Sequence, residues 1–154
     1  MEKKQLQDIY LNALADYKTE IDSDGDVRFR HPELGSFYIS MDAEDDPEFF
    51  RMVFPNFADN NSLEGLEKDE MIVVANEVNS RNKAVKMTVK YMQHDNTWNV
   101  SAQVEAFIAA PNAAPDPALV KATMKRYISA IKAGVVAYAQ AIKDLKGAGD
   151  SGSI

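Results

Sequence analysis

The residues closest to a metal-binding pattern form the acidic run Asp22-Ser23-Asp24-Gly25-Asp26. Alternating carboxylates of this kind begin the calcium loop of an EF-hand, and Glu33 falls at the twelfth position of such a loop. The sixth position, which needs glycine for a sharp turn, is Val27 instead. We therefore interpret the run as a hairpin turn, because Asp and Gly accept left-handed backbone conformations. A calcium loop remains the alternative.

Residues suited to acid–base or nucleophilic catalysis are sparse. A second acidic cluster comprises Asp42, Glu44, Asp45, Asp46 and Glu48. Paired carboxylates can supply an acid and a base, but this polar segment has no neighbouring histidine. His31 and His94 are isolated, and the chain has no cysteine, no nucleophile elbow and no phosphate-binding glycine loop. We therefore expect a noncatalytic protein with no cofactor and no metal site.

Composition and charge narrow the class of protein further. The 154 residues suit a single domain, and an apolar fraction of 45% is typical of a globular chain. With 17 basic and 24 acidic residues, the net charge of −7 disfavours nucleic acid or a membrane as partner. Neither a signal peptide nor a membrane-spanning run is visible, so we expect a cytoplasmic protein. One domain is expected over residues 1–146, followed by a flexible tail at 147–154.

Apolar spacing predicts an α+β fold. Helical periodicity indicates amphipathic helices at about residues 4–18, 63–83 and 117–145. Alternation indicates strands around Val27–His31, Phe37–Met41, Phe49–Phe57, Val85–Tyr91 and Trp98–Ile108. Asp116 is expected to cap the last helix, with Pro117 in its first turn. The expected order is α-β-β-β-α-β-β-α, with helices covering one face of an antiparallel sheet.

The other face of the sheet is predicted to be open to water or to a partner. Alternation directs toward it the side chains of Arg28, Arg30, Tyr38, Arg51, Lys86, Lys90, Ser101, Gln103 and Glu105. The strand at Phe49–Phe57 is apolar on both sides, so its side with Phe49, Arg51, Val53 and Phe57 is covered by a loop or offered to another chain.

Arginine beside aromatic residues is typical of interface hot spots. We therefore predict partner-binding residues on this open side, namely Arg28, Arg30, Tyr38, Phe49, Arg51 and Val53. The competing interpretation is an ordinary wet face whose arginines pair with Asp26, Asp42 or Glu48.

The last helix carries a candidate dimer contact. At roughly 45 Å it is longer than a sheet of short strands would cover, and its small residues permit close backbone approach. The predicted contact residues are Ile131, Gly134, Val135, Tyr138 and Ile142. Packing on the sheet is the alternative. Residues 1–79 are predominantly acidic and residues 80–154 predominantly basic, so the halves attract each other within one chain or across a polar dimer contact.

Several segments resemble the YbjN family, a group often labelled bacterial sensory transduction regulators. They are Ile21–Phe29, Asp45–Arg51, Pro55–Phe57, Val78–Lys86 and Val104–Phe107. The resemblance spans about residues 5–140 and implies a fold similar to type III secretion chaperones. Those chaperones are small, acidic, dimeric cytoplasmic proteins that bind extended client segments. The alanine-rich loop Pro111–Pro115 departs from the family pattern.

Together these features predict a homodimeric, noncatalytic protein-interaction domain that binds a protein client or a regulatory partner. The alternative class is a small-ligand or metal-sensing domain, or an enzyme whose site is assembled from residues scattered along the chain.

Overall fold

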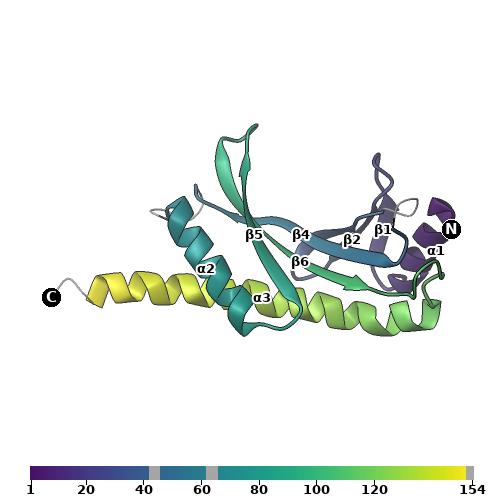
Figure 1. Cartoon of the computed structure of the whole chain (residues 1–154). Helices are drawn as coiled ribbons and strands as arrows, with labels where there is room; N and C mark the ends of the chain where they lie inside the picture. The colour runs from purple at the N-terminus through teal and green to yellow at the C-terminus, as the bar shows by residue number, and fades with distance from the viewer. Residues whose placement is uncertain (42–45, 62–65, 152–154) are drawn as a thin grey trace.

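The computed structural model describes residues 1–41, 46–61 and 66–151. Three helices are present in these ranges, α1 (Lys3–Ala13), α2 (Lys68–Arg81) and α3 (Pro117–Ser151). The strands are β1 (Lys18–Ile21), β2 (Val27–His31), β3 (Gly35–Ile39), β4 (Phe49–Asp59), β5 (Val85–Met92) and β6 (Thr97–Phe107). They form one antiparallel sheet in the order β1-β2-β3-β4-β6-β5 (Figure 1). The predicted α+β class and antiparallel sheet are confirmed.

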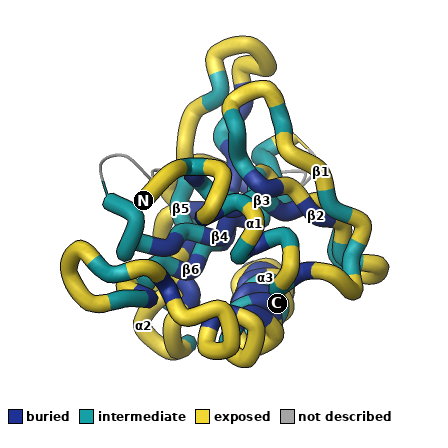
Figure 2. The backbone as a smooth tube through the Cα atoms, turned by 90° about the vertical axis from the view of Figure 1, so that its right-hand side faces the viewer, coloured by how far each residue is buried: buried dark blue, intermediate teal, exposed yellow. Residues whose placement is uncertain are grey.

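The helices share one side of the sheet. The long helix α3 runs beneath the strands and α2 lies beside it, while the β5–β6 hairpin projects away (Figure 1). On the same side, the ring of Tyr10 from α1 packs edge-on against Phe50 of β4, with ring centroids 5.6 Å apart. The buried segments concentrate where the strands meet α3 (Figure 2). One face of the sheet therefore builds the core, and the three helices of the described ranges leave the other face uncovered.

Local sequence explains where the helices begin. Glu67 and Glu70 form a reciprocal capping box at the start of α2. The predicted cap of α3 is also present, since the Asp116 carboxylate accepts a hydrogen bond from the Ala118 amide at 3.0 Å. Pro117 is the first helical residue, where no amide donor is needed.

The first helix is shorter than predicted, and the sheet has one more strand. Helix α1 ends at Ala13, and Lys18–Ile21 pairs with β2 instead of continuing the helix. The predicted order is corrected to α-β-β-β-β-α-β-β-α. Tyr17 still packs on the core, because its ring lies 5.4 Å from that of Phe29. The helical spacing of the apolar residues therefore predicted correctly that Tyr17 packs on the core, but it was wrong to place Tyr17 in a helix.

A bulge in β4 changes which side chains face the core. Phe54 pairs with Ala102 and Ala58 with Val100, so three residues of β4 oppose Ser101 alone. Asn56 in this bulge has φ of 48°. Phe57 consequently faces the helices, with its ring 5.5 Å from that of Tyr138. The predicted placement of Phe57 on the open side is wrong for this reason.

Helix α3 continues to Ser151, beyond the predicted end near residue 145. Its apolar stripe packs inside the chain, with Ile131 0%, Tyr138 1% and Ile142 6% exposed. Gly134 is buried against β5, and Val135 is half-buried. The residues predicted to contact a second copy therefore belong to the core of one chain, because α1, α2 and the strands β4, β5 and β6 pack against α3.

Within the described ranges, no helix has the length and apolar character needed to cross a membrane.

Candidate functional site

The open face is the sheet surface formed by strand side chains that point away from the helices. Directly paired residues in an antiparallel sheet share a face, so the register identifies its members. One row crosses all six strands and consists of Glu20, Arg28, Tyr38, Val53, Gln103 and Lys86. The predicted open-side position of the polar strand residues is thus correct.

This face is basic although the chain is acidic. Its strand residues include six cations and three carboxylates, which are Lys18, Arg28, Arg30, Arg51, Lys86, Lys90, Glu20, Asp59 and Glu105. The open face therefore carries a charge of +3 on a chain whose net charge is −7. An anionic partner is favoured at this surface and disfavoured over the rest of the molecule.

Arg51 belongs to a charged network that joins β4, β6 and β5 on the open face. Its Nε donates to Glu105 Oε1 at 2.8 Å, and Lys86 Nζ donates to the other oxygen of the same carboxylate. Gln103 Nε2 also donates to Glu105, at 2.7 Å. Lys86, followed by Arg51, holds the pKa of Glu105 below its usual range. The competing interpretation of the sequence named Asp26, Asp42 or Glu48 as partners of the arginines. Arg51 pairs with Glu105 instead, which is distant in sequence, and Asp42 lies outside the described residues.

Arg28 lies at the other side of the face and is paired with the β1–β2 turn. Its Nε donates to Asp22 Oδ2 at 3.0 Å, while 55% of the arginine side chain stays exposed. The Asp22 carboxylate also accepts the amides of Asp24 and Asp26, each at 2.9 Å. These hydrogen bonds and the arginine lower the pKa of Asp22.

The acidic run at this turn is a hairpin connection, as predicted. Gly25 adopts φ of +85°, which suits glycine. Lys3 donates its ammonium group to the carbonyl oxygen of Asp24, and Gln7 donates to that of Gly25. Two carboxylates that a calcium loop would offer already accept protein donors, since Asp22 accepts the hydrogen bonds described above and Asp26 Oδ1 accepts the Met41 amide at 2.9 Å. Among the described residues, no cluster of three histidines or carboxylates has the geometry to hold a metal ion. Asp42, Glu44 and Asp45 of the second acidic cluster lie outside the described residues.

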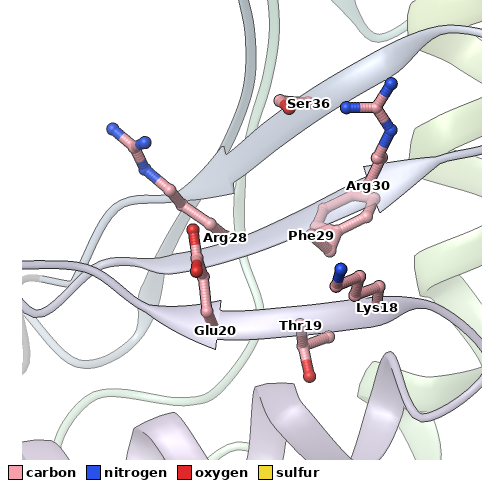
Figure 3. A pocket seen from close by; sticks show the side chains of 7 residues that line it. All are labelled: Lys18, Thr19, Glu20, Arg28, Phe29, Arg30 and Ser36. Atoms are coloured by element: carbon pink, nitrogen blue, oxygen red, sulfur yellow. The ribbon is translucent and has the colours of Figure 1, made fainter.

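A shallow hollow of about 240 Å³ lies over β1, β2 and β3, and we call it the basic hollow. The side chains that line it include Lys18, Glu20, Arg28, Arg30 and Ser36. Figure 3 shows Glu20 toward the Arg28 side and Lys18 toward the Arg30 side. Lys18 and Arg30 are direct cross-strand partners, so two cations face each other. Within the described part of the chain, neither forms an ion pair.

At the far end of the face, Phe49, Arg51 and Phe107 form what we call the aromatic corner. Phe49 and Phe107 are paired across β4 and β6, with ring centroids 5.8 Å apart. The Arg51 guanidinium lies 5.2 Å from the centroid of the Phe49 ring, within the range of a cation–π contact. Phe107 is 76% exposed, the highest value among the large exposed apolar residues described.

A hollow of about 330 Å³ adjoins Phe107 and is also lined by Asp46, Glu48, Ala109 and Pro111. Sequence reasoning missed Phe107 as a site residue. Its position in register with Gln103 and Glu105 was a usable signal, because alternation places the three side chains on one face.

Two other predicted site residues contribute less surface. Val53 is only 4% exposed, although it points away from the helices. It lies between its cross-strand partners Tyr38 and Gln103, which cover it. Tyr38 is half-buried, and this burial raises the pKa of its hydroxyl. The structure thus brings the six predicted residues onto one surface. Val53, however, is buried between its neighbours and offers almost no accessible surface to a partner.

A comparison of the chain with protein-family models, curated proteins and solved structures finds no match. The resemblance to the YbjN family and to type III secretion chaperones accordingly stays a prediction.

Proposed function

We propose that the chain is a noncatalytic protein-interaction domain that binds an extended segment of a client or regulatory protein on its open face. The observation that carries the proposal is the aromatic corner, where Phe107 is 76% exposed on a face that none of the described helices covers. Exposed aromatic side chains beside an arginine provide the composition of interface hot spots. Long strands beneath them supply a rigid support for such contacts.

The shape of the described surface favours a protein segment over a small molecule. The basic hollow and the hollow beside Phe107 are both shallow, and they lie at opposite ends of the open face. Small-ligand sites usually enclose most of their ligand, whereas an extended segment can contact separated anchor points. The proposed role agrees with the chaperone-like regulator that the YbjN resemblance implies. The homodimer remains part of the prediction, without the α3 contact first assigned to it.

A displayed library of random peptides of about 12 residues, panned against the whole chain, tests the proposal. We expect enriched peptides that bind the natural chain and lose at least about tenfold in affinity with Phe107→Ser, as for loss of a hot-spot residue. Val73→Ser is the matched control, because Val73 is an exposed apolar residue on α2, 62% exposed. Both variants should keep the thermal stability of the natural chain, since neither side chain is buried.

Two outcomes would contradict the proposal. Enriched peptides that bind Phe107→Ser as tightly as the natural chain would show that the aromatic corner is not their site. A library that yields no peptide above background would show that the open face does not capture extended segments.

A further inference from the structure

We infer that the segment bound on the open face is acidic, with carboxylate side chains at alternate positions over the basic hollow and an apolar side chain at the aromatic corner. This inference rests on the proposed function and adds the chemical class of the partner.

The cross-strand pair of Lys18 and Arg30 points most directly to an anionic ligand. Like charges directly opposite each other in a sheet repel and destabilise the pairing. Among the described residues no carboxylate pairs with either cation, while Arg28 next to them is paired with Asp22. A bound carboxylate between Lys18 and Arg30 would relieve this repulsion, and the Ser36 hydroxyl beside Arg30 supplies a further donor.

The spacing along β2 matches an extended peptide. Arg28 and Arg30 are two residues apart on one strand, so their side chains repeat after roughly 6.7 Å. An extended segment also repeats its side chains every second residue at about this distance. Acidic residues at positions i and i+2 of the segment therefore lie opposite Arg28 and Arg30. Lys18 lies beside Arg30.

The two hollows are separated by a distance that a short segment spans. From Arg30 to Phe107 the path crosses from β2 to β6 through β3 and β4 and moves three side-chain rows along the strands. With strands about 4.8 Å apart and rows about 6.7 Å apart, the diagonal is about 25 Å, or roughly eight extended residues. This path passes over Tyr38, Val53 and Arg51.

A single-stranded nucleic acid is the other polyanion that binds sheets with exposed aromatic residues. The aromatic corner disfavours it, because Asp46 and Glu48 line the hollow at Phe107 and would repel a backbone phosphate there. A protein segment can be acidic at one end and uncharged at the other. It therefore fits both ends of the face.

The test uses fluorescence polarisation with the whole chain and labelled synthetic peptides of about 12 residues. The first peptide carries two glutamates at alternate positions near one end and a phenylalanine about eight residues further on. In the second peptide the glutamates are replaced by glutamine. The third probe is a labelled oligothymidylate of about 12 nucleotides. The variants are Lys18→Gln combined with Arg30→Gln, and Arg81→Gln as the control. Arg81 is an exposed arginine on α2 that pairs with Glu77.

We expect the glutamate peptide to bind about tenfold more tightly than the glutamine peptide, as two surface charge pairs allow. The combined Lys18 and Arg30 variant should remove most of this difference, because only the contact to Arg28 is left, whereas Arg81→Gln should keep the full difference. Raising the salt from about 150 to about 500 mM should weaken only the glutamate peptide, because the contacts become screened.

Equal binding of the two peptides, no binding of the glutamate peptide, or tighter binding of the oligothymidylate would overturn the inference. The proposed function would still stand if library peptides without acidic residues bound in a manner that depends on Phe107. It would fail separately if Phe107→Ser bound every enriched peptide normally.

Discussion

Gly134 on α3 is the position where a single methyl group best tests how the helix packs. A Cβ added there would lie 2.8 Å from Met87 Cε and 2.9 Å from Val85 Cγ1, both on β5. The Met87 terminus can move aside, but Val85 is β-branched, buried and fixed on a strand. Gly134→Ala therefore forces α3 away from the sheet or strains Val85.

The magnitude follows from two opposing effects. Alanine in a helix interior is favoured over glycine by about 1 kcal/mol. Overpacking a well-filled core costs about 1–3 kcal/mol. Because the Val85 contact falls well inside normal packing distance, we expect a net loss of about 1 kcal/mol in the free energy of unfolding. For a chain of this length such a loss lowers Tm by about 2–4 °C.

Urea unfolding followed by far-ultraviolet circular dichroism and by the fluorescence of the single tryptophan, Trp98, measures the effect. Gly147→Ala is the control, because a Cβ at Gly147 meets nothing within 4 Å, so the variant should be unchanged or more stable. In a Val85→Ala background, Gly134→Ala should lose most of its cost. A stabilised Gly134→Ala chain, or one altered only in its oligomeric state, would refute the packing argument.

Four further changes have defined outcomes. Asn79→Ala should lower the free energy of unfolding by about 1–2 kcal/mol in urea titrations, because the Asn79 amide pairs with both the N–H and the C=O of Met87 on the edge strand β5. Ala84→Gly should raise it by about 1 kcal/mol, because Ala84 has φ of 66°, and an unchanged Tm would contradict this reason. Tyr138→Phe should not lower Tm, because the buried hydroxyl has no hydrogen-bond partner in the described structure. The same burial raises the pKa of the Tyr138 hydroxyl to about 12. Glu105→Gln should lower the free energy of unfolding at neutral pH, and the difference in this free energy from the natural chain should shrink as pH falls below about 4.3. A difference that stays constant with pH would show that the carboxylate charge is not responsible. This sign follows because a folded-state pKa held low contributes stability above the unfolded pKa and loses it on acidification.

The elements that the sequence predicted well are those whose signal is local. Met71, Val74 and Val78 share one side of α2 and are buried as their spacing predicts. The alternation of β2 likewise placed Phe29 in the core and Arg30 outside it. In both cases the period of the backbone alone decides which side a residue faces.

The features that sequence reasoning missed depend on contacts between distant segments. β1 has four residues, and its identity as a strand comes from pairing with β2. The bulge that turns Phe57 inward had a weak local signal in Pro55, since proline within a strand often marks an irregularity. Helical spacing showed that Tyr138 lies on an apolar stripe, but it could not show that Phe57 and the rest of the same chain cover that stripe.

The segregation of charge by the fold also determines how an acidic segment would reach its site. Strand alternation gathers cations on the open face, while much of the acidic charge lies in turns and on helices, as at Asp24 and Asp69. At low salt the net charge of −7 repels an acidic segment at long range, even though the open face attracts it at contact. Near physiological ionic strength the Debye length is about 8 Å, so the distant repulsion is screened while contacts to Lys18 and Arg30 persist. The arrangement therefore favours selection at contact over electrostatic steering, and differences among acidic segments should appear mainly in their dissociation rates.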